Sequence, residues 1–283
     1  MIKVQSIQDR PLILTIQRII RQSYTFAYLK RRLIYMDVYI KNYELFDKIV
    51  VYDFKLGDGG LGDNIKFFMF VLESCMKKKE RLYYKKNNID IENYIKLKHS
   101  KMYVDNEMLQ HLQNVKIVVP QMFYSSIDYN YSININQVFY FTDEVIINSK
   151  LLFPNDVTDY LSIHVRLGDK YLETEMKYVL CKEDVRTFSE EKIHNFIEKN
   201  YSKNILLCCD NNSYKVKLKE KYKNIIITNC DIGHSSLFNT TTKQILDAVT
   251  EFYILTNSSI IFSASNSGFS RIASKFNNIP LII

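Results

Sequence analysis

The sequence predicts an α/β protein in which two domains, each built on a parallel β-sheet, face each other across a cleft. From residue 160 onward, short apolar segments alternate with amphipathic ones, and alternating strands and helices are typical of a parallel sheet covered on both faces. Nearer the N-terminus, a buried strand at 49–52 leads through a glycine-rich loop into a helix. The length of 283 residues suits two domains, which we place at residues 1–150 and 151–283.

The expected elements follow the hydrophobic periodicity of the chain. Residues 1–46 are predicted to be mainly helical, whereas 80–110 carry no clear pattern and 121–150 are taken as the connection between the halves. The predicted strands are 49–52, 115–119, 161–166, 204–209, 224–228, 259–263 and 279–282. The predicted helices are 65–76, 189–199, 213–222, 243–257 and 267–276.

Charge and cysteine content limit the partners and the compartment. An excess of 38 Lys and Arg over 31 Asp and Glu gives a net charge of +7, which suits anionic ligands but is more simply explained by a lysine-rich surface. The five cysteines show neither zinc-ligand spacing nor a disulfide framework, so we expect a reducing compartment. The N-terminal residues lack the pattern of a signal peptide, and no apolar run reaches the ~20 residues of a membrane span. We therefore expect a cytoplasmic protein without a transmembrane segment.

The strand 161–166 ends in the strongest candidate site. His164 and Arg166 lie two residues apart, so their side chains point to the same face of the strand, which stops at Gly168. Ligands of open α/β sheets bind at the carboxyl ends of strands. A buried guanidinium needs an anionic partner, and a phosphate accepts two of its N–H donors at once. We therefore predict that His164 and Arg166 bind a phosphate, and that Asp169 caps the loop or orients Arg166.

Glycines and hydroxyl side chains mark two further junctions between strand and helix. The segment 57–62 holds four of the seven glycines and lets the backbone approach a ligand, although it matches neither the Walker A loop nor the dinucleotide fingerprint. Ser265, Asn266, Ser267 and Gly268 precede or begin a helix, whose free N–H groups and positive dipole end suit a phosphate. A tight turn and an ordinary N-cap are the structural alternatives.

The order of these motifs resembles the fucosyltransferase superfamily, which includes α1,2-, α1,6- and protein O-fucosyltransferases. The matching segments are 59–68, 164–169, the strand 205–209 with Asp210 after it, Glu251 before an apolar strand, and 265–270. The resemblance covers roughly residues 49–80 and 160–283. It implies a GT-B fold of two Rossmann-like domains. It also implies that the C-terminal domain binds GDP-fucose, that the N-terminal domain binds the acceptor, and that neither a metal nor another cofactor is required.

The resemblance assigns roles to individual residues. Arg166 matches an arginine that contacts the β-phosphate of the nucleotide-sugar, and this residue is also expected to be catalytic. Glu251 falls where α1,6 members carry an aspartate that binds guanine, since a carboxylate accepts two donors from the guanine edge. The full set of expected nucleotide-sugar contacts is Gly60, Gly62, His164, Arg166, Asp210, Glu251, Ser265, Asn266, Ser267 and Gly268.

Two positions leave alternatives open. A glutamate stands at 251 where α1,6 members have an aspartate, and Asp247 lies one helical turn earlier as a rival guanine-binding carboxylate. Asp63 stands where other members have an asparagine. As a carboxylate facing the cleft it is the expected base that deprotonates the acceptor hydroxyl, and capping of the loop is its structural alternative.

The sequence therefore predicts an inverting glycosyltransferase that moves fucose from GDP-fucose to a sugar hydroxyl of a glycan, with an α1,2 linkage as the first choice. Another nucleotide-sugar, protein O-fucosylation, and a related binding module without turnover are the alternatives within this fold. A nucleic-acid-binding protein would need a basic stripe with interleaved aromatics. Residues 24–43 supply only a diffuse version of it, so no nucleic-acid partner is expected.

Overall fold

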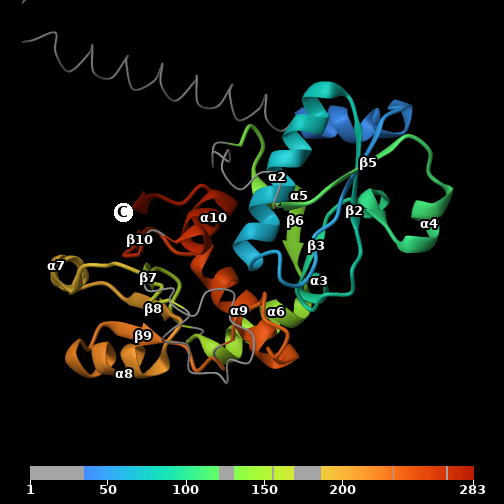
Figure 1. Cartoon of the computed structure of the whole chain (residues 1–283). Coiled ribbons are helices and arrows are strands. Elements are labelled where there is room, and N and C mark those ends of the chain that lie inside the picture. The colour runs from blue at the N-terminus through green and yellow to red at the C-terminus, as the bar shows by residue number, and fades with distance from the viewer. Residues whose placement is uncertain (1–34, 121–130, 155, 169–185, 232, 266) are drawn as a thin grey trace, which may run out of the picture.

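The computed structural model describes residues 35–120, 131–154, 156–168, 186–231, 233–265 and 267–283. These residues form two α/β halves that lie side by side in Figure 1, the earlier half in blue to green and the later half in yellow to red. The expected helical segment before residue 35 lies outside the described residues, as do Asp169 and Asn266.

The first half is built on a parallel sheet of four strands in the order β4-β2-β1-β5. The central strand β1 (Ile49–Tyr52) is buried along its whole length and pairs with β2 (Arg81–Lys85) and β5 (Val115–Val118). β4 (Tyr103–Val104) pairs with the outer edge of β2. Helix α2 (Leu61–Lys78) carries the apolar face that the sequence predicts. β1, β5 and α2 are thus confirmed.

Several short strands and helices lie in segments where the hydrophobic periodicity predicted no element. β3 (Ile95–Leu97) and β6 (Phe139–Phe141) form an antiparallel pair beside the main sheet. The other short elements of this half are η2 (Tyr43–Leu45), α3 (Ile91–Tyr94), η3 (Ser100–Met102), α4 (Asn106–His111) and α5 (Ile135–Val138). The sequence missed β2 because its three central residues are all buried and therefore show no alternation of polar and apolar residues.

The second half is a five-stranded parallel sheet in the order β11-β10-β7-β8-β9. Its strands are β7 (Leu161–Val165), β8 (Ile205–Cys209), β9 (Ile225–Ile227), β10 (Ile261–Ser263) and β11 (Leu281–Ile282). Its helices are α7 (Glu190–Lys199), α8 (Asn212–Lys221), α9 (Thr242–Leu255) and α10 (Gly268–Phe276). Every strand and helix predicted for this half is confirmed, and α6 (Asp143–Leu152), which packs on α9, leads into it.

In both sheets, the first strand is the place where the strand order reverses. β2 and β4 continue to one side of β1 and β5 lies on the other, while β8 and β9 continue to one side of β7 and β10 lies on the other. Open α/β sheets bind ligands outside the carboxyl ends of the strands at such a reversal. The ends of β1 and β7 are therefore the places where this fold can form a site.

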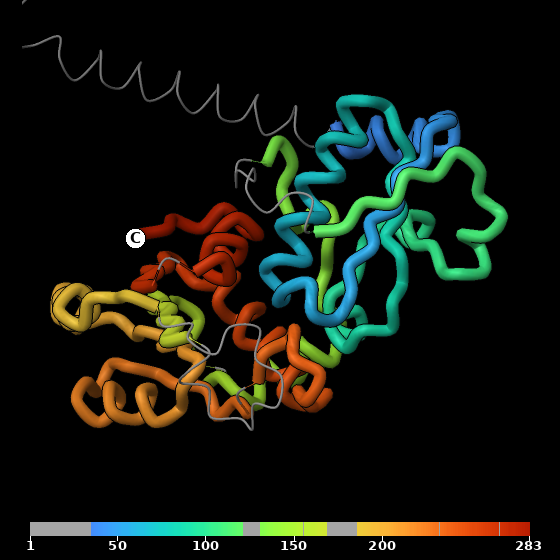
Figure 2. Tube along the Cα trace, viewed as in Figure 1, coloured from blue at the N-terminus to red at the C-terminus, as the bar shows by residue number. Residues whose placement is uncertain are grey.

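The two halves share one apolar core. Phe252 of α9 and Ile272 of α10 belong to the same buried cluster as Phe68 and Leu72 of α2. Figure 2 shows the orange-red chain of α9 and α10 running back from the second half towards the first. Within the described ranges, no helix is both long enough and apolar enough to cross a membrane.

Candidate functional site

The strand ends of the second sheet converge on Arg166, the first residue after β7. Its backbone N–H donates to the Ser265 hydroxyl, with 2.7 Å between N and Oγ. Its Nη1 lies 2.7 Å from Oδ2 of Asp210, which directly follows β8. Because β7 pairs with β8 on one side and β10 on the other, these residues meet although they are far apart in the chain. The guanidinium and the turn before α10 therefore lie at one edge of the sheet.

Asp210 holds the loop after β7. Its Oδ1 accepts the N–H of Leu167 at 2.7 Å, and its Oδ2 accepts the N–H of Gly168 at 3.1 Å in addition to Nη1 of Arg166. Gly168 has a φ of +111°, which favours glycine. The carboxylate of Asp210 thus contacts both the guanidinium and the loop; the prediction that Asp169 caps this loop or orients Arg166 lies outside the described residues. A contact between Asp210 and the nucleotide-sugar stays a prediction.

His164 is a buried, neutral imidazole beside this arginine. Its ring stacks on Phe269 of α10, with 5.2 Å between ring centroids and 21° between planes. Burial, together with the charge of Arg166, lowers the pKa of His164 to about 3, because both disfavour the protonated ring. Nδ1 is buried and has no hydrogen-bond partner in the described part of the chain. At neutral pH the residue therefore adds a polar ring to the site but no charge.

Serine hydroxyls shape the first turn of α10. The N-cap residue Ser267 accepts the N–H of Phe269 at 3.3 Å, and its own N–H donates to the Ser263 hydroxyl at 3.3 Å. The Ser263 hydroxyl also contacts that of Ser270, with 2.6 Å between the oxygens. The first N–H groups of a helix have no partner within the helix, and their partial positive charge suits an anion. Gly268 opens this turn, as predicted.

The glycine loop brings the start of α2 against the second half. A Cβ on Gly62 would lie 3.3 Å from Cα of Phe269, and one on Gly60 would lie 3.4 Å from Oγ of Ser235. The N–H of Leu61 donates to that same hydroxyl at 3.0 Å. Gly60 and Gly62 therefore allow a close approach between the halves at the site. Their predicted contact with the nucleotide-sugar stays a prediction.

Asp63 caps α2 from within its first turn. Its Oδ2 accepts the N–H of Gly60 at 3.3 Å, and its Oδ1 lies 2.7 Å from Nζ of Lys66. The side chain remains 31% exposed, so solvent or a ligand can reach it. Asp63 thus makes the capping contact that was the structural alternative to a base. Its role as the base stays a prediction.

The two rival guanine-binding carboxylates differ in how they are engaged. Asp247 is fully buried. Its Oδ2 accepts from Nζ of Lys243 at 2.7 Å and from the N–H of Asp231 at 2.9 Å, while its Oδ1 accepts from Nδ2 of Asn148 at 3.1 Å. Both oxygens of Asp247 therefore serve to hold α9 in the structure.

One of the two carboxylate oxygens of Glu251 contacts other side chains. Its Oε1 lies 3.0 Å from Nζ of Lys215 and accepts the hydroxyl of Thr228, whereas Oε2 has no hydrogen bond among the described residues. Burial by itself lowers the pKa of Lys215, but the charge and hydrogen bond of Glu251 together with the nearby thiols of Cys230 and Cys208 outweigh it, so this pKa is raised. Of the two carboxylates, Glu251 is thus the one that keeps an oxygen without a hydrogen bond among the described residues, and its contact with guanine stays a prediction.

Several residues of the site gave little signal in the sequence. Lys215 lies on a lysine-rich helix, where a lysine is normally exposed, yet it is 1% exposed. Ser235 belongs to the loop 233–240. Gly233, one of seven glycines in the chain, is the one sequence feature that marks this loop. The stacking of Phe269 on His164 depends on the pairing of β7 with β10 and could not be seen in the pattern.

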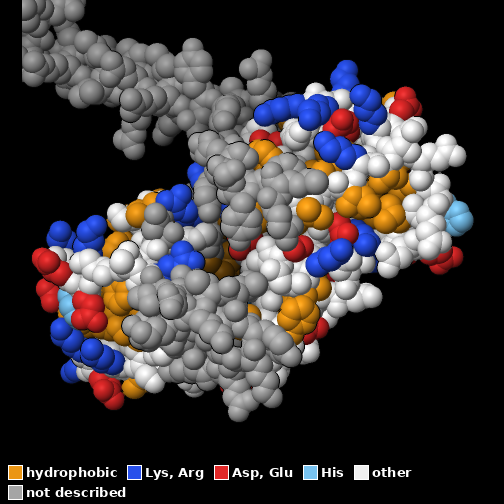
Figure 3. Space-filling model, in the orientation of Figure 1, with side chains coloured by type: hydrophobic (Ala, Val, Ile, Leu, Met, Phe, Trp, Pro, Cys, Tyr) orange, Lys and Arg blue, Asp and Glu red, His pale blue; other side chains and the backbone are white. Residues whose placement is uncertain are grey.

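The distribution of surface charge and the placement of possible metal ligands bear on what the protein binds. On the described part of the face in Figure 3, Lys and Arg side chains lie in separate groups with Asp and Glu between them, not in one basic stripe. Among the residues that the structure describes, no group of three or more His, Cys, Asp or Glu is placed to hold a metal ion.

Known structures share this arrangement of two sheets. An Arabidopsis thaliana FUT1 mutant in complex with GDP superposes with a TM-score of 0.52 over 92% of this chain and 78% of its own, at 12% identity. The fold is that of the fucosyltransferases. NodZ α-1,6-fucosyltransferase co-crystallised with GDP gives 0.50 over 80% and 91%, at 10% identity. The apo form of POFUT1 gives 0.50 over 83% and 97%, at 11% identity. No protein-family model matches the chain, and no curated protein matches it.

These structures confirm the GT-B architecture predicted from the motifs. At 10–12% identity, the likeness establishes the fold.

Proposed function

We propose that the chain is a glycosyltransferase of the fucosyltransferase type that uses GDP-fucose and transfers fucose to a sugar hydroxyl of a glycan, with inversion and an α1,2 linkage. The observation that carries this proposal is the convergence of Arg166, Asp210 and Ser265 beside the first turn of α10. The solved structures of the same fold include complexes with GDP, which supports a nucleoside diphosphate as the ligand of this edge.

The proposed reaction follows from the charges at the site. The bond between C1 of fucose and the β-phosphate oxygen breaks, GDP leaves with the electron pair, and the acceptor oxygen bonds to C1 from the opposite face. Negative charge grows on the β-phosphate as the sugar departs. A fixed Arg166 and the N–H groups at the start of α10 stabilise that charge more in the transition state than in the ground state. Asp63 is the proposed acceptor of the hydroxyl proton.

The guanine base is assigned to the carboxylate of Glu251. Nζ of Lys215 lies 3.0 Å from this carboxylate in a buried setting, and an opposite charge at hydrogen-bond distance offsets the loss of hydration. An ionised carboxylate accepts two N–H donors from guanine, which adenine and uracil do not both present. The first half is proposed to bind the acceptor, and the second half to bind the nucleotide-sugar.

Metal-free catalysis and a cytoplasmic location are part of the proposal. Arg166 and the helix N-terminus together supply positive charge for the diphosphate. Cys75, Cys208, Cys209 and Cys230 are buried free thiols, which suits a reducing compartment.

Calorimetry with GDP, UDP and ADP tests the ligand, and a hydrolysis screen over GDP-, UDP- and CMP-sugars with and without EDTA tests the reaction. We expect GDP to bind at least ~10-fold more tightly than ADP or UDP, and GDP-fucose to be hydrolysed equally well with EDTA. Equal affinity for the three nucleotides would contradict the assignment of Glu251. RNA binding that falls steeply with salt, without hydrolysis of any nucleotide-sugar, would support a nucleic-acid-binding protein instead.

A further inference from the structure

Helix α8 places one of its lysines in the interior of the second half. Lys215 is 1% exposed, whereas the other three lysines of this helix are exposed. Its Nζ donates to the carbonyl of Thr228 at 3.2 Å, to the hydroxyl of Thr228 at 3.3 Å and to Oε1 of Glu251 at 3.0 Å. An ammonium group has three protons, and here each of them has an acceptor. Lys215 therefore acts on a ligand through the groups that it holds, not by direct contact.

Thr228 connects this lysine to the carboxylate. It directly follows β9, and its hydroxyl accepts from Lys215 and donates to Oε1 of Glu251. The three side chains are buried and form a closed set of hydrogen bonds, which we call the Lys215–Thr228–Glu251 triad. Because α8 and the end of β9 both fix a side chain of α9, the carboxylate is held in place before a ligand binds, which lowers the entropy lost on binding.

The triad leaves the second oxygen of Glu251 available. Oε2 makes no hydrogen bond among the described residues, and the side chain of Glu251 is 11% exposed where that of Lys215 is 1% exposed. An ionised carboxylate has about four acceptor sites. Since the triad uses two on Oε1, Oε2 keeps two for other donors. A buried ion pair is weak evidence for stability, so stability alone is a poor reason for a lysine at this place.

The triad lies at the same edge of the sheet as Arg166. Thr228 follows β9 and Arg166 follows β7, with β8 between these strands. Adjacent strands are ~4.8 Å apart, so the two strand ends are separated by ~10 Å. The β-phosphate and the base of an extended nucleoside diphosphate are separated by a distance of this order. Asp210, which contacts Arg166, stands directly before the N-cap of α8, so one segment supports both ends of the proposed ligand.

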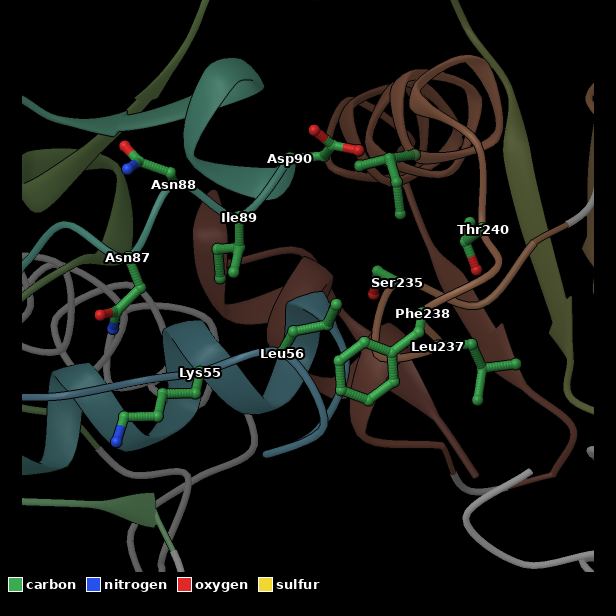
Figure 4. Close-up of a pocket in the computed structure, with 11 residues that line it drawn as sticks. Lys55, Leu56, Asn87, Asn88, Ile89, Asp90, Ser235, Leu237, Phe238 and Thr240 are labelled. Carbon is green, nitrogen blue, oxygen red and sulfur yellow. The ribbon is translucent and has the colours of Figure 1, made fainter. Parts of the chain in front are cut away.

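A cavity between the two halves is the other place where a base could bind. Its volume is about 500 Å³, which is within the usual range for small-molecule sites. Figure 4 shows Asn88 and Asp90 on one side of it and Ser235 on the other. No member of the triad is among the described residues that line this cavity. A base bound there would therefore not contact the carboxylate of Glu251.

We infer that Lys215 and Thr228 are positioning residues that set the selectivity for guanine. They hold Oε1 of Glu251, and the two free acceptor sites of Oε2 match the N1–H and the 2-amino group of guanine. The inference rests on the proposed function and names the residues that make its nucleotide site selective.

Calorimetry on the full-length protein tests this inference with GDP, with inosine diphosphate (IDP), which lacks the 2-amino group, and with inorganic pyrophosphate, which lacks a base. The measured quantity is the GDP preference, defined as the Kd for IDP divided by the Kd for GDP. Thr228→Val removes the hydroxyl and keeps the ion pair. Thr256→Val is its matched control, because Thr256 is equally buried and its hydroxyl donates to the carbonyl of Tyr253 at 2.7 Å.

Two further variants complete the set. Lys215→Met removes the cation of the triad, with Lys217→Met on the exposed face of α8 as its control. Asn88→Gly tests the cavity, since Asn88 has a φ of +56° and glycine adopts this conformation without strain. Binding of pyrophosphate shows that each variant is folded and keeps the edge that holds Arg166.

We expect the wild-type protein to prefer GDP at least ~10-fold, because IDP lacks one hydrogen bond to a charged group. Thr228→Val should lower this preference at least ~3-fold, and Lys215→Met at least ~10-fold, because a buried carboxylate without its cation takes up a proton. The Kd for pyrophosphate should stay unchanged in every variant, and the three control substitutions should keep the GDP preference.

A Glu251→Gln background separates positioning from a general structural role. Residues that act through Glu251 should have no further effect on the GDP preference in this background. An equal loss in both backgrounds would overturn the inference. Unchanged preference in folded Thr228→Val and Lys215→Met would also overturn it, as would a changed preference in Asn88→Gly, because the base would then bind in the cavity.

Failure of the proposed function gives a different result. The wild-type protein would then bind neither GDP nor pyrophosphate and would not hydrolyse GDP-fucose. The inference alone fails when the wild-type protein hydrolyses GDP-fucose but either shows no GDP preference or keeps its preference in both triad variants.

Discussion

The two sheets have the same topology around their first strand but end in opposite charges. β1 is followed by Asp53, a buried carboxylate that accepts from Asn87 at 2.7 Å and lies 3.3 Å from Nζ of Lys85. β7 is followed by Arg166, whose guanidinium is oriented by Asp210. A carboxylate at a strand end repels a phosphate, whereas a guanidinium attracts it. This difference in charge at equivalent places in the two sheets supports the proposal that the diphosphate binds to the second half.

The halves also differ in what their interiors contain. In the first half, Tyr52, Phe68 and Tyr84 pack ring against ring, with 5.6–5.7 Å between centroids. The second half buries an ion pair, Lys215 with Glu251. A buried pair is costly to break because the remaining charge is left without a partner. The second half thus buries its lysine almost completely, whereas Lys85, which pairs with Asp53 in the first half, keeps 14% of its side chain exposed.

Removing one partner of the buried pair has the largest expected effect on stability. Lys215→Met leaves Glu251 buried without its cation, and we expect the free energy of unfolding to fall by about 3 kcal/mol or more. Urea unfolding measures it, with Lys217→Met, on the exposed face of α8, as control. The double variant with Glu251→Gln should recover at least half of the loss. Unchanged stability of Lys215→Met would remove the contrast between the two interiors.

Arg166→Ala tests the charge at the end of β7. We expect turnover of the nucleotide-sugar to fall at least ~100-fold, since a transition-state contact of roughly 3 kcal/mol is lost. Initial-rate measurements with GDP-fucose give the value, and circular dichroism checks that the variant is folded. Arg166→Lys, which keeps the charge but not the planar fork, should recover part of the rate. Near-normal turnover in folded Arg166→Ala would exclude this residue from the mechanism.

Asp63→Asn tests whether Asp63, at the junction of the two halves, acts as the base or only caps helix α2. We expect transfer to the acceptor to fall ~100-fold, because an amide cannot take the proton, while calorimetry shows an unchanged Kd for GDP. Asp58→Asn in the same loop is the control. A lowered melting temperature with full transfer activity would mean that Asp63 only caps α2.

The pH dependence of stability tests the buried imidazole, with the smallest expected effect. The pKa of His164 is about 3 in the folded protein and about 6.5 when unfolded, so below pH 6.5 the unfolded state binds a proton that the folded state does not. Stability then falls by ~1.4 kcal/mol per pH unit as the pH drops from 6.5 towards 3. Urea unfolding at pH 7.5 and 5.0 should show wild-type protein losing ~2 kcal/mol more than His164→Gln. Equal losses would mean that His164 is protonated or solvated in the folded state.

Much of the second half could be predicted because its strands are short apolar runs with polar residues at their ends. β7 and β8 are completely buried, and the residues after them, Arg166 and Asp210, are the ones that meet. The carboxyl ends of parallel strands lie at one edge, so motifs in sequence order become neighbours in space. By contrast, β2 and the pair β3–β6 were missed, because a two- to five-residue strand is specified by its neighbours more than by its own residues.

The sequence by itself determined the alternation of strands and helices and the chemistry at the strand ends, since both depend on local periodicity and on which residue follows a strand. Only the tertiary structure decided that Lys215 is buried against Glu251, that Asp210 contacts both Arg166 and the loop after β7, and that a cavity lies between the halves. These features join residues far apart in the chain, such as Leu61 and Ser235, which are 174 positions apart. Local pattern carries no information on contacts of that kind, because they form only when the two sheets pack against a shared core.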